Sequence, residues 1–598
     1  ENTAVGNQAL GGNTTASYNN AFGTGALYAN TTGTHNNAFG ANALDAVTTS
    51  GYNCAFGKDS LGKNTANNNT AYGTESLREN VSGVKNVAVG SEALRDTTTD
   101  ENTALGYCAG MVTTSGGENT FIGSRAAEAN TTGYENVAVG RVALFANTTG
   151  IKNTAVGKGA LYANTTGSNT AVGQNALYSV TTTSNNTAVG QIALEDCTGQ
   201  ENTALGYKAA ANLTSSEGTI AIGNNAMGEG TTTGSNNVVV GSNAAKSMTS
   251  GYANIAAGTE ALEATTTGNK NVAIGYRALH QATTADQCVA IGYYALEANT
   301  SDYQTAIGFE TLSAHTTGSE NTGVGFNVMT SLTTGTKNTG VGYKALKFNT
   351  SSHNTAVGHD ALEQCTDSPG NTAMGSYSMA NGTVEGSTMG YNTAIGYATL
   401  YVATTAKANC AMGHAAGYGV TDGENNLLLG NNAGRASAPS GNITTGDNNV
   451  CLGDNYIANL YCADTTISSS DERDKADITA WNHGLDWINK LEPITYRWDK
   501  RAWYVDDPST PQNEGVPDGS KKKSRLHLGF RAQNVLAVEK EDGFASKKDD
   551  MLLVNLNEDN TAYGMKYERL VVVLTKAVQE LSAKNDALTA RITALESN

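Results

Sequence analysis

The chain has 598 residues, of which 68 are glycine and 39% are hydrophobic, and its net charge is −18. So little apolar material argues against a series of conventional cores and favours a repetitive, extended architecture. Residues 1–469 carry a balance of −15. Nucleic acid and anionic membranes are therefore not expected as partners, because such binding depends on clustered Lys and Arg.

The chain starts Glu1-Asn2-Thr3, without Met and without a charged-then-apolar signal pattern. We expect a fragment or a processed chain whose attachment region is missing. The sequence contains no apolar run long enough to span a bilayer, so membrane insertion is not expected.

A short phrase, Asn-Thr-Ala-Val-Gly at residues 2–6, recurs in 27 copies up to the one that ends at Gly453. The closing glycines are almost evenly spaced, beginning with Gly6, Gly23, Gly40, Gly57, Gly73 and Gly90. Each copy places an apolar residue before Gly, an Ala-Leu pair shortly after it, and then a turn rich in Thr and Gly. Two apolar stretches per copy, each too short for a helix, predict two short strands in each coil of a parallel β-solenoid.

Recurrent Ala indicates a narrow interior, and recurrent Asn predicts a ladder of hydrogen-bonded amides on successive coils. At an inter-strand spacing of roughly 4.8 Å, the coils would form a rod of about 130 Å. Because a narrow coil buries little, we expect several chains to associate laterally through the apolar position before Gly.

The phrase Asn-x-Ala-(Val/Ile)-Gly-x-x-Ala resembles the repeat of the β-roll heads of trimeric autotransporter adhesins, over about residues 1–453. That family's unit is shorter, and this chain inserts a longer Thr-Gly turn. The resemblance implies a trimer.

Two repeats are longer than the others, those that end at Gly396 and Gly453, and their extra material lies in residues 376–390 and 436–446. Loops of this kind either contact a receptor or merely widen the rod towards the next domain.

The repeats show no catalytic constellation. Their carboxylates are scattered around the coils, so a glycan depolymerase stays an alternative without a located site. Recurrent Thr pairs raise the alternative of an ice-binding surface, but the Gly that follows them places them in turns. The basic cluster at residues 521–525 is either a phosphate-binding or localisation patch or, as we favour, a solvated loop.

Eight cysteines are scattered with no CxxC pair and no His at zinc spacing. We therefore expect structural thiols, no disulfide framework, no metal and no cofactor. The positions are Cys54, Cys108, Cys197, Cys288, Cys365, Cys410, Cys451 and Cys462.

The composition changes near residue 470, after which lie all four Trp and about half of the Lys and Arg. Ser469 and Glu472 have capping-box spacing and predict a helix start. From Tyr567 a heptad pattern predicts a coiled coil, with Leu574, Leu581, Leu588 and Leu595 in one core position and Asn585 as a polar selector in the other.

Residues 470–598 resemble the intramolecular chaperone domain of phage endosialidases and tail fibres. The matching blocks are Ser470-Asp471-x-Arg473-x-Lys475-x-x-Ile478, Ile488-x-x-Leu491-x-Pro493-x-x-Tyr496-x-Trp498, Gly529-Phe530-x-Ala532-Gln533 and the final helix. The resemblance implies a trimerisation chaperone that cuts itself off between Ser469 and Ser470, with Ser470 as nucleophile and Lys475 as base.

Positions five apart lie about 140° apart on a helix and on opposite faces of a strand. Ser470 and Lys475 therefore meet only if a turn intervenes or if Lys475 serves a neighbouring chain. His527 is a second candidate acid or base, although packing within a strand is the favoured interpretation.

The predicted domains are a solenoid rod at 1–453, a linker at 454–469, a self-cleaving chaperone at 470–566 and a coiled-coil helix at 567–598. Together they predict a homotrimeric phage tail fibre, assembled in the host cytoplasm and carried on the virion, that attaches to a host-surface glycan or protein. The alternatives are a bacterial surface adhesin built from the same modules and a fibre-borne depolymerase.

Overall fold

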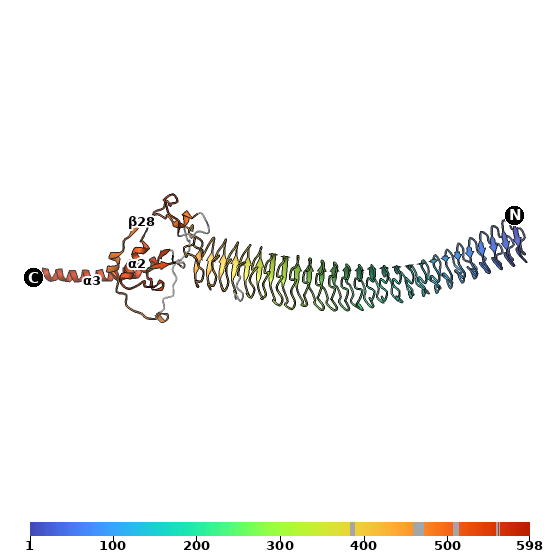
Figure 1. The fold of residues 1–598 in the computed structure, drawn as a ribbon, viewed down its shortest axis with the longest axis horizontal. Helices are drawn as coiled ribbons and strands as arrows, with labels where there is room; N and C mark the ends of the chain where they lie inside the picture. The colour runs from blue at the N-terminus through green and yellow to red at the C-terminus, as the bar shows by residue number, and fades with distance from the viewer. Residues whose placement is uncertain (383–388, 458–471, 506–513, 558–559, 561, 598) are drawn as a thin grey trace. The chain divides into compact units, whose positions relative to one another are not determined.

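The computed structural model describes residues 1–382, 389–457, 472–505, 514–557, 560 and 562–597. It contains two compact units, Glu1–Asn338 and Thr339–Asn598. The first consists of solenoid coils, and the second contains further coils followed by a small α+β region (Figure 1). The predicted fold class, a mostly β parallel solenoid followed by a small α+β domain, is confirmed.

The solenoid coils of the first unit each contribute one short strand. The strands are β1 Thr3–Val5, β2 Asn20–Phe22, β3 Asn37–Phe39, β4 Cys54–Phe56, β5 Thr70–Tyr72, β6 Val87–Val89, β7 Thr103–Leu105, β8 Thr120–Ile122, β9 Val137–Val139, β10 Thr154–Val156, β11 Thr170–Val172, β12 Thr187–Val189, β13 Thr203–Leu205, β14 Ile220–Ile222, β15 Val238–Val240, β16 Ile255–Ala257, β17 Val272–Ile274, β18 Val289–Ile291, β19 Thr305–Ile307 and β20 Thr322–Phe326.

Consecutive strands pair in parallel and in register, so equivalent residues of successive coils face one another. Ala4 pairs with Ala21, and Ala21 with Ala38. Figure 1 shows the strands of consecutive coils as parallel arrows within each unit. Because the middle residue of a strand points inward and its neighbours point outward, the small Ala at this position is buried and the apolar residue before Gly faces out.

The Ala-Leu pair after each Gly was predicted to form a second strand, and that prediction is wrong. Both residues of the pair Ala26-Leu27 are fully buried. Successive side chains of a strand point to opposite faces, so a strand cannot bury both. Instead Leu27 adopts a left-handed conformation with φ of 52°, as do its equivalents in other coils, and the turn directs both side chains inward.

The predicted Asn ladder is present, and backbone groups are its main partners. Oδ1 of Asn36 accepts hydrogen bonds from the backbone N–H and the side-chain amide of Asn53, both at 3.1 Å. Nδ2 of Asn36 donates to the carbonyl oxygen of Ser50 at 2.9 Å. Since Asn36 and Asn53 are almost completely buried, the ladder satisfies polar backbone groups inside each turn.

The closing Gly of each coil is required by the stacking distance. Gly123 has φ of 135°, and a Cβ placed there would lie 2.5 Å from the carbonyl oxygen of Gly140 in the next coil. A larger residue would therefore be strained and would also separate two coils.

The second unit continues the one-strand coil and then changes fold. Its solenoid strands are β21 Thr339–Tyr343, β22 Thr355–Val357, β23 Thr372–Met374, β24 Thr393–Ile395, β25 Cys410–Met412, β26 Leu427–Leu429 and β27 Val450–Leu452. The elements of the α+β region are α1 Leu485–Lys490, β28 Ile494–Tyr496, β29 His527–Gly529, α2 Ala532–Glu541, β30 Val554–Leu556, β31 Tyr563–Met565 and α3 Leu570–Glu596.

The α+β region has its own core, in which Trp487 of α1, Val535 of α2, Val554 of β30 and Val573 of α3 are buried together. Two antiparallel pairs, β28 with β29 and β30 with β31, complete it. Among the described residues, the buried side chains of α3 all lie in its first turns, at Leu570, Val573 and Ala577. The helix predicted from the heptad pattern is therefore confirmed, and most of it extends beyond the core.

Candidate self-cleavage site

The proposed scissile bond lies between Ser469 and Ser470, and both residues fall outside the described part of the chain. The description resumes with a single 3-10 turn, Glu472–Asp474, where a capping box predicted a helix start. Lys475 follows this turn, is exposed, and donates its backbone N–H to the carbonyl oxygen of Glu472 at 3.1 Å. The assignment of Ser470 and Lys475 as a catalytic pair therefore remains a prediction.

The backbone around Lys475 is irregular. Between the turn that ends at Asp474 and the start of α1 at Leu485, the structure assigns no helix or strand. A regular element would have kept Ser470 and Lys475 apart, whereas a turn leaves room for them to meet. The local fold is thus compatible with either arrangement expected from the sequence, within one chain or between chains.

A buried carboxylate joins two segments of this region. Glu539 of α2 is fully buried and accepts backbone hydrogen bonds from Leu552, Leu553 and Val554 at 3.1, 2.5 and 3.1 Å. These bonds attach α2 to the segment that enters β30.

An aromatic cluster that the sequence analysis did not identify surrounds α1. Trp487 packs edge-on against Trp481, with ring centroids 5.0 Å apart, and its indole N–H donates to Asp542. His483 lies 3.4 Å from Asp486 and 3.5 Å from Asp542. The sequence showed that Trp residues gather after residue 470, but it could not show the cluster itself. Trp487 and Asp542 lie 55 positions apart and are brought together by the fold.

Two triads of the described residues have the composition of metal ligands, Glu260 with Glu263 and His280, and His483 with Asp486 and Asp542. In the first, Arg277 contacts Glu260 at 2.6 Å and His280 contacts Glu263 at 2.8 Å. In the second, Asp542 accepts the Trp487 indole N–H. Ion pairing and hydrogen bonding account for both groups, so neither defines a metal centre.

Lys500 is a partly buried lysine that the sequence did not single out. Its Nζ donates to the backbone carbonyl of Asn455 at 3.1 Å and lies 5.0 Å from the centre of the Trp498 ring. Burial lowers the pKa of Lys500, and the nearby Asp454 carboxylate opposes that shift. The contact ties the residues that follow β27 to the α+β region.

His527 lies in β29 as expected, and its ring stacks on Tyr496 of β28 with centroids 5.5 Å apart. The basic cluster at 521–525 is exposed, yet it is more than a solvated loop. Lys521 donates to the backbone carbonyl of Trp503, and the Lys523 ammonium lies 4.8 Å from the centre of the Trp503 ring.

Residues 470–544 match the family described as Chaperone of endosialidase. The match begins at Ser470 and includes Lys475, α1, α2 and Glu539. A comparison with curated proteins found no match. The chain thus combines a parallel β-solenoid with an endosialidase-type intramolecular chaperone domain, an arrangement typical of phage tail fibre or spike proteins. Within its described residues, no helix is both long and apolar enough to cross a bilayer.

Proposed function

We propose that this protein is a homotrimeric phage tail fibre that attaches the virion to the host surface, and that its C-terminal chaperone folds the trimer and then releases itself. The domain boundaries inferred from the sequence, 1–453, 454–469, 470–566 and 567–598, are part of this proposal. It is supported by the family match at 470–544, which directly follows the solenoid and its linker.

The main support for the trimer is an apolar seam of α3 that stays exposed in the described part of the chain. Leu570, Val573 and Ala577 face the core of the α+β region and are buried. The heptad positions point elsewhere and are between 47% and 70% exposed, at Val571, Leu574, Val578, Leu581, Leu588, Ile592 and Leu595. Leucines repeating once per heptad are the pattern that a parallel coiled coil buries.

The solenoid presents a second apolar surface of the kind that lateral association would bury. The outward position before the closing Gly is exposed and apolar in many coils, for example Phe56 at 45% and Leu105 at 51%. Because strands pair in register, these side chains form a continuous column. Contiguous apolar patches of this extent usually mark interfaces.

A trimeric coiled coil would bring three chain ends together before the solenoids wind. It would thereby reduce the loop-closure entropy of finding the register between long, self-similar chains. This gives the C-terminal domain a physical role as a chaperone, and it explains why the domain can be discarded once the rod is complete.

For self-cleavage, Ser470 Oγ attacks the carbonyl carbon of Ser469 while Lys475, as a neutral amine, accepts the hydroxyl proton. The proton passes to the nitrogen of Ser470 as the C–N bond breaks, and water then hydrolyses the resulting ester. An ordinary lysine has a pKa near 10.4, so the neutral form requires a desolvated site. Assembly of three chains would provide such desolvation.

The test is a denaturing gel of the expressed chain beside Ser470→Ala and Lys475→Ala. We expect the unmodified chain to give two fragments divided at residue 470 and both variants to give one full-length band. Lys500→Ala is the matched control, because it removes another lysine of the same region, and it should still be cut. An intact band from the unmodified chain would refute self-cleavage.

A further inference from the structure

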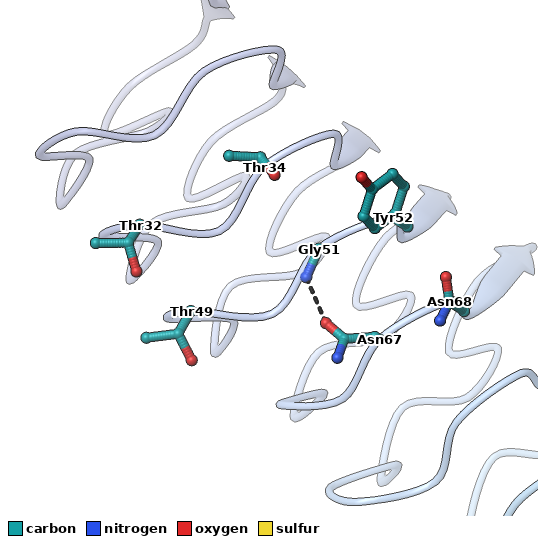
Figure 2. Close-up of a pocket in the computed structure, with 7 residues that line it drawn as sticks. All are labelled: Thr32, Thr34, Thr49, Gly51, Tyr52, Asn67 and Asn68. Atoms are coloured by element: carbon teal, nitrogen blue, oxygen red, sulfur yellow. Dashed lines mark hydrogen bonds between the residues drawn. The ribbon is translucent and has the colours of Figure 1, made fainter.

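A hollow of about 330 Å³ opens on the Thr-rich turns of the first coils (Figure 2). It is lined by Thr32, Thr34, Thr49, Gly51, Tyr52, Asn67 and Asn68, which come from three successive coils. The lining therefore consists of hydroxyl groups, amides, backbone and one aromatic ring, and it contains no charged group.

The hollow arises from a change of coil length. The repeat between Gly40 and Gly57 is one residue longer than the repeat between Gly57 and Gly73, and the missing residue lies in the Thr-rich turn. The Asn67 side chain partly compensates, because its Oδ1 accepts the backbone N–H of Gly51 at 2.7 Å (Figure 2). This bond fixes the orientation of the Asn67 amide in the lining of the hollow.

Tyr52 gives the hollow an aromatic wall. One face of its ring stacks on His35, with centroids 4.8 Å apart and planes within 6°. His35 stacks in turn on Tyr18 at 5.0 Å, so the ring ends a rigid aromatic column. Tyr52 is nevertheless 63% exposed, because Asn68 and not a ring occupies the equivalent position in the next coil.

The aromatic ring distinguishes this hollow from related places on the rod. Repeats shortened in the same way also end at Gly106, Gly173, Gly206, Gly308 and Gly358. At the position equivalent to Tyr52, the coils that precede these repeats carry Lys85, Lys152, Asn185, Gln287 and Lys337. In this set, the coil before the shortened turn carries an aromatic ring only at Tyr52, although Tyr303 lies within the shortened turn that ends at Gly308.

We propose that this hollow binds one residue of a neutral saccharide. A pyranose presents C–H groups that pack on an aromatic face and hydroxyl groups that pair with Thr hydroxyls and Asn amides. A volume of about 330 Å³ lies at the small end of ligand sites and suits a single sugar ring. The uncharged lining and the −15 balance of residues 1–469 disfavour acidic sugars.

This inference rests on the proposed host attachment only for its biological role. For that role, it specifies a neutral saccharide as the chemical class of the receptor. A site so open would bind one sugar weakly. Three copies in a trimer that engage one polysaccharide would raise the apparent affinity by multivalency without any new contact.

The test measures binding of methyl glucoside, methyl galactoside and methyl N-acetylglucosaminide to the intact protein by saturation-transfer NMR and calorimetry, with N-acetylneuraminic acid as the acidic comparator. We expect at least one neutral glycoside to bind, and Tyr52→Ala to weaken its binding by about tenfold or more. Tyr303→Ala is the matched control, because Tyr303 is 54% exposed and also lies two positions before a strand, away from the hollow.

A second variant, Thr49→Lys, fills the hollow without touching the aromatic column and should also abolish binding. The inference is overturned if no neutral glycoside binds, if the acidic sugar binds more tightly, or if the two Tyr variants lose affinity equally. Adsorption of labelled protein to host cells is measured separately. Adsorption that persists in Tyr52→Ala and Thr49→Lys would refute this site while leaving the proposed fibre function intact.

Discussion

Oε1 of Glu539 accepts the backbone N–H of Leu553 at 2.5 Å, inside the core of the α+β region. The same carboxylate also binds the N–H groups of Leu552 and Val554, so one side chain satisfies three backbone donors. Charge-assisted bonds of this kind are stronger than neutral ones, and losing the acceptor leaves buried donors unpaired.

Glu539→Ala should therefore destabilise the chaperone domain by about 3 kcal/mol or more. We would measure this in a Ser470→Ala background, where the domain stays attached, by tryptophan fluorescence during denaturation. All four Trp lie after residue 470, so the signal reports this domain alone. Glu541→Ala is the control, because the Glu541 side chain is 61% exposed and forms a surface ion pair with Lys490. Equal effects of both changes would contradict this role of Glu539.

Removing one Asn of the ladder should lower the local stability of the coil. Asn136→Ala removes the acceptor for the Asn153 N–H, at 3.0 Å, and the donor to the Gly150 carbonyl, at 2.9 Å. A loss of about 2–4 kcal/mol is expected, since both partners lie inside the coil. Limited proteolysis near residues 136–153 should accelerate by about thirtyfold or more, because about 1.4 kcal/mol corresponds to tenfold.

Gln174 is exposed, so Gln174→Ala should leave the proteolysis rate unchanged. Asn136→Gln should lie between the two, because Gln304 occupies a ladder position and its Oε1 accepts the Asn321 N–H at 3.2 Å. Identical digestion of Asn136→Ala and the unmodified chain would contradict the role of the ladder.

The apolar seam of α3 predicts which positions would hold the proposed trimer together. Leu581→Asp combined with Leu588→Asp should abolish trimerisation, because charges replace core leucines of the coiled coil. Light scattering in the Ser470→Ala background would report the mass. Ala590→Asp introduces one such charge on the opposite side of α3 and should leave the trimer intact. A trimer that survives the double change would show that α3 does not drive assembly.

The reactivity of the thiols would show which solenoid face the proposed trimer buries. Cys54 opens β4 on the outer sheet face and is exposed in one chain, whereas Cys197 and Cys288 are fully buried. Partial burial raises the pKa of the Cys54 thiol above its ordinary value, so its alkylation rate should increase as the pH rises in the alkaline range. Burial raises the pKa of Cys197 and Cys288 to about 11, and these thiols should resist at every pH that preserves the fold.

In the trimer we expect Cys54 to be protected as well, and the double α3 variant to expose it. Mass spectrometry after a short iodoacetamide pulse would give the three extents of labelling. Rapid labelling of Cys54 in the intact trimer would place the interface elsewhere.

The sequence predicted the coil, its register and the Asn ladder because all three repeat with the same period. It failed on the strand count, because the Ala-Leu phrase is equally compatible with a strand and with a turn. The choice depends on burial: both Ala26 and Leu27 must face inward, which forces Leu27 to φ of 52°. Leu rarely adopts a positive φ, so this conformation could not be predicted from the residue type.

The candidate site could be predicted only as a motif. Ser470 and Lys475 lie five positions apart, and their spacing alone excluded one regular element. The partners of Lys500 and His483 could not be foreseen, because Asn455 and Asp542 are distant in the sequence and are brought near by tertiary packing. The hollow beside Tyr52 was not predicted either, because it depends on a single residue missing from the turn of the next coil.

In-register stacking has an evolutionary consequence. Residues 124–140 form one complete coil, and removing them would join Gly123 to Arg141 across an equivalent junction. The strands on either side, β8 and β10, would then pair as β8 and β9 do now. Recombination between repeats can therefore lengthen or shorten the solenoid in steps of roughly 4.8 Å while leaving every remaining coil with the neighbours it needs.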